Sequence, residues 1–404
     1  MSRHFLYVVL IFPVILVAGA SANAAGAVSD DVIRIGVLTD LSGVSSGDAG
    51  QNSVIAAELA LEDNEGEVLG APIEIIAMDH ESDADVALKR ARALVEEHNV
   101  DMVTDLVRSN TALAVQKYLT DNGVIVMPTG AGASQLYNEL CSPLAFHWGL
   151  DGYAQSKGIA VALTDGPEDT WFFVTADYAF GHNVESATGA LAEAAGGKVL
   201  GSSRYPYKAT DIRENLRAAT DSGATIIGLA SGGRDTQRAI RQSYSVGLRD
   251  GSRDLAAILM FATDIRRIGL YVAKGLKFVT PFYWSRDEAS RAFAERVHAR
   301  SGAMPTMIHA GVYSAISNYL KAVNEAGTDK PRIVARVLRE MKIDDAFARN
   351  GYIRKDGLLV QDLSLVEVKS ARESEQAWDY YKPLKTIPGD EAFMPLEASR
   401  CESL

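Results

Sequence analysis

The sequence is poor in cysteine, with only Cys141 and Cys401 among its 404 residues. Neither has a second cysteine nearby, and no two of the seven histidines have the spacing of metal ligands, which argues against a metal site and a thiol nucleophile. In an exported chain the two cysteines can form a disulfide that joins the C-terminal tail to the middle of the chain. We expect this disulfide in preference to two free thiols.

The sequence also lacks the motifs of nucleotide binding and of common hydrolases. The loop GVSSGDAG at residues 43–50 follows a strand-like run and precedes a helical pattern, as phosphate-binding loops do. It fits neither G-x-G-x-x-G nor G-x-x-x-x-G-K-S/T, and no lysine is placed to meet a phosphate. G-x-S-x-G and H-E-x-x-H are absent, and no pair of carboxylates stands out. These absences argue against an enzyme and predict that no cofactor is bound.

Positive charge is outnumbered, with 40 Lys and Arg against 52 Asp and Glu and a formal net charge of −12. This balance argues against nucleic acid and anionic membrane surfaces as partners. Beyond the N-terminus no apolar run is long enough to span a bilayer, so we expect no membrane insertion of the mature chain.

The N-terminus has the features of a signal peptide. Arg3 precedes an apolar run at residues 5–20, and Ala22-Asn23-Ala24 then supplies the small residues that a signal peptidase needs. We expect residues 1–24 to be removed and the protein to be exported. The alternative, an uncleaved anchor, is disfavoured because the run is short for a membrane span and a cleavage site follows it.

Strand-like and helical patterns alternate along most of the chain. Residues 72–78 are rich in β-branched side chains, and residues 83–97 carry apolar side chains at the 3.6-residue period of an amphipathic helix. The alternation starts again after His147 and includes an expected strand at residues 255–261, whereas mostly helical patterns follow Trp284. Two series of βα units predict an α/β fold of two Rossmann-like lobes with parallel sheets.

Polar loops stand at the ends of several expected strands, where open α/β sheets bind ligands. VRSNTA and PTGAGAS lie just before helix starts, so Ser109, Asn110 and Thr129 can offer side-chain groups and residues 131–134 can offer backbone N–H groups. Ser109 and Asn110 could equally be ordinary helix caps. Together the two loops favour a small carboxylate ligand.

Several segments match one known family: IRIGVLTDLSG, SDADVALKRARALVEEHNVDMV, GVIVMPTGA, DYAFG, RQSYSVGL and GVYSAISNYLKAVNEAG. Through them the chain resembles the leucine/isoleucine/valine-binding proteins of ABC transporters, which have the type I periplasmic binding protein fold. The resemblance implies two lobes joined by three crossovers, with the ligand between them. Lobe 1 would comprise residues 32–146 and 284–351, and lobe 2 would comprise residues 147–283 and 352–404.

The resemblance also implies a function. The protein would be the periplasmic solute-binding component of an ABC importer, a monomer that captures a small carboxylate by hinge closure and delivers it to the membrane permease. The alternative is an exported ligand sensor that presents its closed form to a membrane receptor, because the same fold serves both roles.

Carried over by position, the resemblance implies roles for individual residues. Ser109 matches the serine that contacts the ligand carboxylate, and Ala131 and Gly132 lie in the loop that donates backbone N–H groups beside it. Phe180, in DYAFG, matches an aromatic wall of the second lobe, with Tyr178 close by.

Two positions depart from the pattern of amino-acid binders. Gly232-Gly233 stands where those proteins have a tyrosine, and FATDIR leaves only Thr263 or Asp264 where they have a glutamate for the α-ammonium group. If Asp264 does not point into the cleft, a buried ammonium has no partner, which would be costly. We therefore expect a bulky carboxylate, aromatic acids included, at least as readily as a branched-chain amino acid.

Other residues bear on the size of the expected pocket. Ser45 and Ser46 stand about where relatives often present an aromatic side chain to the ligand, which predicts a roomier or more polar edge. The aromatic residues that could line the pocket, unless they belong to the core, are Trp148, Tyr178, Phe180 and Tyr283.

Overall fold

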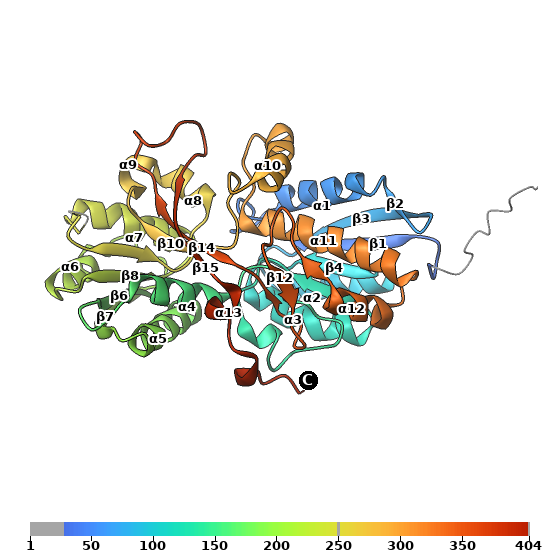
Figure 1. Cartoon of the computed structure of the whole chain (residues 1–404), viewed down its shortest axis with the longest axis horizontal. Helices are drawn as coiled ribbons and strands as arrows, with labels where there is room; N and C mark the ends of the chain where they lie inside the picture. Colours follow the sequence, from blue (N-terminus) through green and yellow to red (C-terminus); the bar gives the residue numbers. More distant parts are fainter. Residues whose placement is uncertain (1–27, 249–250, 403–404) are drawn as a thin grey trace, which may run out of the picture.

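The computed structural model describes residues 28–248 and 251–402. Within them, two large sheets are each covered by helices on both faces and form two lobes side by side (Figure 1). The expected α/β fold of two lobes is thus confirmed. The expected signal peptide, residues 1–24, lies outside the described residues.

The first lobe is built on five described strands in the order β2-β3-β1-β4-β5. Every pairing is parallel except that of β2 with β3. The central strand β1 is buried along nearly its whole length, as expected for a parallel strand covered on both faces. The strands are β1 Ile33–Thr39, β2 Glu67–Val68, β3 Ala71–Asp79, β4 Met102–Asp105 and β5 Ile125–Pro128.

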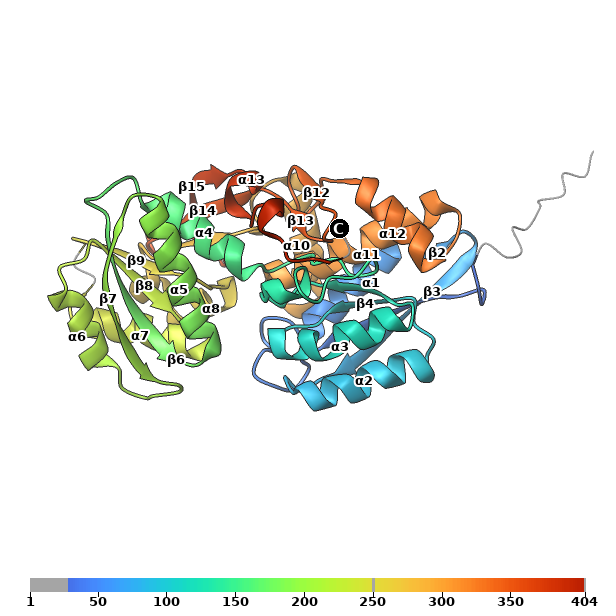
Figure 2. The same ribbon diagram turned by 90° about the horizontal axis from the view of Figure 1, so that it is seen from below.

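Helices from distant parts of the sequence cover this sheet. α2 and α3 pack together on one face, and α1 packs with α10 and α11 on the other (Figure 2). The stripe expected at residues 83–97 forms α2, whose Asp83 side chain accepts hydrogen bonds from the first-turn N–H groups of Asp85 and Val86. The helices are α1 Gln51–Asp63, α2 Ala84–Glu96, α3 Ser109–Asp121, α10 Glu288–Ser301, α11 Met307–Ala326 and α12 Pro331–Glu340.

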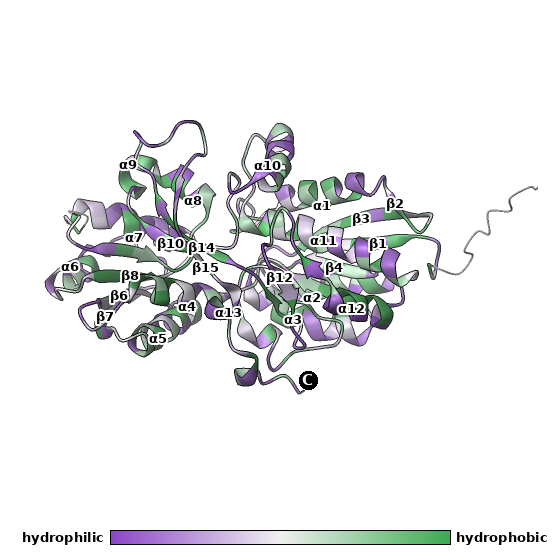
Figure 3. Cartoon of the chain, viewed as in Figure 1, coloured by the Kyte–Doolittle hydropathy of each residue, from purple (hydrophilic) through white to green (hydrophobic). Residues whose placement is uncertain are grey.

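The second lobe is built on seven described strands in the order β15-β14-β10-β9-β8-β6-β7. β6 to β10 are parallel, and β14 and β15 extend the sheet with antiparallel pairings. The interior strand β8 is buried throughout and hydrophobic along most of its length (Figure 3). The strands are β6 Thr170–Asp177, β7 Lys198–Pro206, β8 Ile226–Ala230, β9 Asp254–Ala257, β10 Lys277–Thr280, β14 Leu363–Val368 and β15 Tyr381–Ile387.

One expected strand of this lobe is shorter than predicted. The strand expected at residues 255–261 ends at Ala257, and helix α8 begins at Ala262. The Asp264 carboxylate accepts the Phe261 N–H and so caps α8, which turns the apolar run out of the sheet. The helices of this lobe are α4 Gly152–Leu163, α5 Ala179–Ala194, α6 Arg213–Asp221, α7 Arg234–Ser245, α8 Ala262–Ile268 and α9 Leu270–Ala273.

The chain passes between the lobes after β5, after β10 and after a small antiparallel sheet. That sheet lies beside α12 and contains β11 Lys342–Ile343, β12 Gly351–Ile353 and β13 Leu359–Val360. The boundary expected between residues 351 and 352 therefore falls inside β12. The chain enters the second sheet only at β14, because β12 pairs with strands on either side of it.

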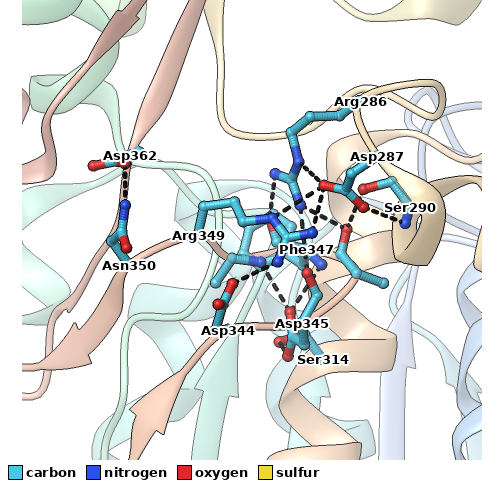
Figure 4. A network of polar contacts seen from close by, with 12 residues as sticks. Arg286, Asp287, Ser290, Ser314, Asp344, Asp345, Phe347, Arg349, Asn350 and Asp362 are labelled. Carbon is cyan, nitrogen blue, oxygen red and sulfur yellow. Dashed lines mark hydrogen bonds and ion pairs between the residues drawn. The ribbon is translucent and has the colours of Figure 1, made fainter.

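A polar network ties the second crossing to the segment that leads to the third (Figure 4). The Arg286 guanidinium donates hydrogen bonds to the carbonyls of Pro281 and Phe347 and pairs with Asp287, which also pairs with Arg349. Burial alone would raise the pKa of Asp287, but a backbone hydrogen bond and the two guanidinium groups hold that pKa well below its ordinary value. These contacts hold the second crossing and the segment before the third crossing together.

The C-terminal tail returns to the first lobe. After β15, the short helix α13 Gly389–Ala392 packs against α4 of the second lobe. Beyond it, the Arg400 N–H donates to Asn138, and Cys401 forms a disulfide with Cys141 in the first lobe. The expected disulfide is present, and it links the lobes a further time. Short 3-10 turns precede the two cysteines at η1 Ser134–Leu136 and η2 Leu396–Ala398.

Candidate functional site

The two lobes meet through loops that follow the carboxyl ends of parallel strands. The loop after β1 carries Asp48, whose carboxylate accepts a hydrogen bond from Thr263 Oγ1 at 2.5 Å and lies 3.4 Å from an Arg267 guanidinium nitrogen. Thr263 and Arg267 belong to α8, directly after β9. The carboxyl edges of the two sheets therefore face each other, which is where open α/β sheets bind ligands.

In the first lobe the structure brings the two predicted polar loops together. The Arg108 N–H, between β4 and α3, donates to the Gly130 carbonyl, between β5 and α4, at 3.1 Å. Three residues just before α3, Asp105, Leu106 and Arg108, have positive φ angles of 70°, 52° and 75°. Such angles are uncommon for residues other than glycine and mark this turn as strained.

The start of α3 is an open donor site. Arg108 is the N-cap, and within the described residues no side chain accepts hydrogen bonds there. Ser109 is the first helical residue and half-buried, and exposed Asn110 donates at 3.4 Å to the Ser82 carbonyl. Capping therefore does not account for either side chain, and the first-turn N–H groups can meet an anion.

The neighbouring loop offers backbone groups only. Ala131 is fully buried, so its side chain belongs to the core of the first lobe. The Gly132 carbonyl accepts the Gly152 N–H at 3.0 Å, which holds the loop against the first crossing. Thr129 is also fully buried, and its hydroxyl has no hydrogen-bond partner among the described residues.

In the second lobe the predicted aromatic wall is assembled. Tyr178 follows β6 and packs against Phe180 and Tyr207, with ring centroids 6.0 Å and 4.8 Å away. A side chain at Gly232 would place its Cβ 3.6 Å from the Tyr178 hydroxyl oxygen and 3.7 Å from a Phe180 ring carbon. Tyr178 and Phe180 thus occupy the space in front of Gly232, whereas no described atom lies within 4 Å of a Cβ at Gly233.

Asp264 is turned into the second lobe and away from the cleft. It is fully buried, and its two oxygens accept hydrogen bonds from Gln237 Nε2 at 2.6 Å and from the Phe261 N–H at 3.0 Å. Burial, followed by the nearby charge of Asp48, raises the pKa of Asp264 to about 7. Thr263 is likewise engaged, because its hydroxyl donates to Asp48. Neither side chain is free to replace the glutamate of amino-acid binders.

The remaining aromatic candidates lie apart from the Tyr178 wall. Tyr283 follows β10 and lines a narrow pocket with Phe261, Met307 and Tyr381. Its strand is separated from β6 by β9 and β8, a distance of about 14 Å at the usual strand spacing. Trp148 is buried in the core, where its indole N–H donates to Ser314.

The loop expected at the edge of the pocket folds on itself around Asp40. This carboxylate accepts the N–H groups of Gly43 and Ser45 at 2.6 and 2.7 Å, and Ser82 Oγ also donates to it. Ser46 Oγ donates to the Gly43 carbonyl. The two serines therefore shape a polar edge mainly through contacts inside the loop.

The sequence interpretation missed three charged residues of the cleft. Asp48 and Arg267 bridge the lobes, and Arg108 projects from the turn that carries Ser109. Burial raises the pKa of Tyr178, and the positive charge of Arg108 acts in the opposite direction, so Arg108 of the first lobe lies close to the aromatic wall of the second. An arginine at a strand end directly before a helix was the available signal for Arg108.

The described residues carry few other candidate features. In residues 28–248 and 251–402, no three His, Cys, Asp or Glu side chains are grouped so that they could hold a metal ion. None of the helices in the same ranges is both long and apolar enough to cross a bilayer.

The chain is similar to known proteins that have the same architecture. A family model of periplasmic binding proteins matches residues 32–373. A periplasmic binding protein from Burkholderia mallei is 40% identical, with 92% of this chain and 99% of that chain covered and a TM-score of 0.84. A branched chain amino acid ABC transporter periplasmic ligand-binding protein from Burkholderia xenovorans is 36% identical over the same shares, with a TM-score of 0.87.

A more distant structure shares the fold. The solute-binding protein of an ABC transporter from R. palustris, in complex with 4-hydroxybenzoate, is 22% identical over 89% of this chain and 97% of that chain, with a TM-score of 0.78. No curated protein sequence gives a significant match. The family match covers most of the chain, and the two Burkholderia proteins align along nearly all of it. The chain therefore belongs to the periplasmic binding protein family, in its type I, leucine/isoleucine/valine-binding-protein-like form.

Proposed function

We propose that this protein is the periplasmic solute-binding component of an ABC importer and that it captures a small carboxylate between its lobes. The observation that carries the proposal is the pairing of an open donor site at the start of α3 with the aromatic wall of the second lobe. Helix N-termini bind carboxylates through backbone N–H groups, and aromatic side chains cover the apolar body of a ligand. Relatives that share the fold are transporter proteins for ligands of this kind.

Individual residues have separate roles in this proposal. Ser109 and the first turn of α3 hold the carboxylate, with Asn110 at the rim and the backbone of Ala131 and Gly132 beside them. Tyr178 is the centre of the wall that covers the ligand body. Phe180 and Gly232 shape that wall. The other residues expected at the site have no direct part in it, because Thr263 is engaged by Asp48, Asp264 is buried in the second lobe and Tyr283 lies apart from the wall.

Ligand capture would operate through closure of the cleft. The contacts of Asp48 with Thr263 and Arg267 join the two lobes and can form only when the lobes are close. A ligand that touches both walls would stabilise this closed arrangement and shift the population toward it. The membrane permease is the proposed partner of the closed form, the mature protein acts as a monomer in the periplasm, and it carries out no reaction of its own. A role as a sensor has no specific observation in its favour.

A thermal-shift screen of the mature chain, residues 25–404, tests the proposal. The ligands would be amino acids, aliphatic acids and aromatic acids. A ligand at a thousandfold excess over its dissociation constant stabilises the folded state by about 4 kcal/mol, which is a large shift in melting temperature. Stabilisation by an acid or amino acid supports the proposal, and a flat response to the whole panel contradicts it.

A further inference from the structure

Arg108 is a cleft cation without a protein counterion among the described residues. Its backbone is held by the hydrogen bond to Gly130, and its side chain is partly buried. Within residues 28–248 and 251–402, this side chain makes no hydrogen bond, ion pair or ring contact. Most of the arginines nearby differ from it. Arg267 lies beside Asp48 and Asp264, and Arg238 pairs with Asp235.

The acidic groups around the cleft are already engaged. Five carboxylates surround it on both lobes, and each accepts at least one hydrogen bond or ion pair from a protein donor. They are Asp40, Asp48, Asp79, Asp235 and Asp264. One further carboxylate, Asp105 in the turn before α3, is fully buried, and neither of its oxygens has a hydrogen-bond partner among the described residues. An ammonium group at the surface of the cleft would meet only carboxylates that already have protein donors, and losing its hydration without a free partner is costly. A carboxylate would find Arg108.

A second donor beside Arg108 also lacks an acceptor. His80 is fully buried, and its Nδ1 accepts the Ser82 N–H at 3.0 Å, which places the ring hydrogen on Nε2. Burial lowers the pKa of His80, the charges of Asp40 and Asp79 oppose this effect, and the charge of Arg108 adds to it, so all three charged groups lie near the ring. His80 Nε2 has no partner among the described residues. The unpartnered guanidinium of Arg108 suits an anion and not a cation.

We infer that Arg108 is the anion-binding residue that sets ligand class, and that the ligand is a carboxylic acid without an α-ammonium group. This inference rests on the proposed function. The guanidinium would hold the carboxylate in a bidentate manner beside Ser109 and the N-terminus of α3. It would also disfavour a zwitterion, because the α-ammonium group of an amino acid bound there would lie next to a like charge. The Tyr178 wall then covers an aromatic or branched aliphatic body.

Matched ligand pairs test this inference directly. Leucine is compared with 4-methylpentanoate, and phenylalanine with 3-phenylpropionate, because each pair differs only in the α-ammonium group. Isothermal titration calorimetry of the mature protein should show that each acid binds at least tenfold more tightly than its amino acid. Tighter binding of the amino acids overturns the inference and leaves the proposed function standing, whereas no binding by any acid or amino acid overturns both.

Substitutions at Arg108 test whether this residue causes the preference for acids over amino acids. Arg108→Gln should weaken binding of the acids about 10–100-fold, as expected for loss of a charge-assisted contact, and should leave the amino acids unchanged or tighter. Arg108→Lys should recover only part of this loss, because lysine keeps the charge without the bidentate geometry. The matched control is Arg336→Gln, which removes an exposed arginine of α12 in the same lobe and should leave binding unchanged.

The design also separates binding from folding. Arg108→Gly suits the positive φ of this position, so it should fold at least as well as the natural protein while it loses the acid preference. Equal acid binding by Arg108→Gln, Arg108→Gly and the natural protein would overturn the inference. So would an equal loss in the Arg336→Gln control.

Discussion

Three helices that begin at the cleft each follow a residue with a positive φ angle, but the type of that residue differs between the lobes and within the first lobe. In the second lobe α7 starts after Gly233, with φ 57° and ψ −128°, and in the first lobe α1 starts after Gly50, with φ 63° and ψ −136°. Helix α3 starts after Arg108, with φ 75° and ψ 133°. Glycine adopts positive φ without a steric penalty, whereas a residue with a Cβ atom costs about 1–3 kcal/mol there.

The contrast indicates what each turn contributes to the cleft. The turn at Gly233 is unstrained and has no side chain, and Tyr178 supplies the surface beside the preceding residue, Gly232. The turn at Arg108 holds a strained residue whose side chain has no protein partner among the described residues. Strain of this kind is common at functional sites, where the side chain is needed in place. The first lobe therefore supplies charge and donors, and the second supplies aromatic surface.

A large side chain at Gly232, beside the aromatic wall of the second lobe, should have the largest effect on ligand affinity. Gly232→Tyr restores the residue that amino-acid binders have, and its ring would compete with Tyr178 and Phe180 for the space in front of Gly232. We expect ligand affinity to fall by a factor of about 100, roughly 3 kcal/mol, with little change in the Arg108 side of the cleft. Calorimetry with the best ligand of the screen measures this loss. Unchanged affinity would show that this wall does not touch the ligand.

Removing a donor from the polar side should have the next largest effect. Ser109→Ala should weaken binding by about 1–3 kcal/mol if the hydroxyl meets a carboxylate. The melting temperature without ligand should change little, because the Ser109 side chain caps nothing in the described structure. Thermal shift with and without ligand separates the two quantities. An unchanged affinity would remove Ser109 from the proposed site.

Asp264 should make stability depend on pH. Burial raises its pKa from 3.8 to about 7, so the folded state binds a proton that the unfolded state releases. The resulting stabilisation is complete below the unfolded pKa and is lost as pH rises through about 7. Asp264→Asn should therefore be about 1–2 kcal/mol more stable than the natural protein at pH 8 and nearly equal to it at pH 4.

Urea denaturation at both pH values checks this expectation. The control is Asp221→Asn at the exposed end of α6, where the substitution should have the same small effect at both pH values. Equal effects of Asp264→Asn at the two pH values would show that Asp264 is ionised in the folded protein.

Substitutions that change the backbone strain at Arg108 and at Gly233 should have the smallest effect, and that effect is on the free energy of unfolding. Arg108→Gly should raise the free energy of unfolding without ligand by about 0.5–1 kcal/mol, because it relieves a positive φ. Gly233→Ala should lower it by about 1 kcal/mol for the opposite reason. Urea denaturation without ligand measures both. Destabilisation by Arg108→Gly would mean that the arginine supports the fold and is not merely tolerated by it.

Much of the architecture was predictable because it depends on local periodicity. The apolar side chains at residues 83–97 lie on one face of a helix, so only that face could be buried. This segment forms α2, with Asp83 as its N-cap. The strand expected at residues 255–261 was too long, because the pattern of apolar residues does not reveal that Asp264 caps a helix at Ala262. The short strands β11 to β13 were missed because few residues carry their pattern.

The candidate site was predictable in position and only partly in chemistry. Ser109, Gly132 and Tyr178 stand at strand ends, and strand ends of parallel sheets meet at one edge, so their location follows from the fold. The sequence did not predict the position of Asp264, whose oxygens accept hydrogen bonds from Gln237 and from a backbone N–H inside the second lobe. No sequence pattern specifies which partner a carboxylate will find.

The sequence by itself determined two α/β lobes with polar loops and an aromatic segment at their facing edges, because the period of apolar residues dictates which surfaces must be buried. Only the tertiary structure decided the charge balance between those edges. The carboxylates of Asp48 and Asp264 accept hydrogen bonds from donors far away in sequence, while the Arg108 guanidinium has no acceptor among the described residues. Electrostatic pairing depends on distances across the fold, and those distances exist only once the chain has closed around the cleft.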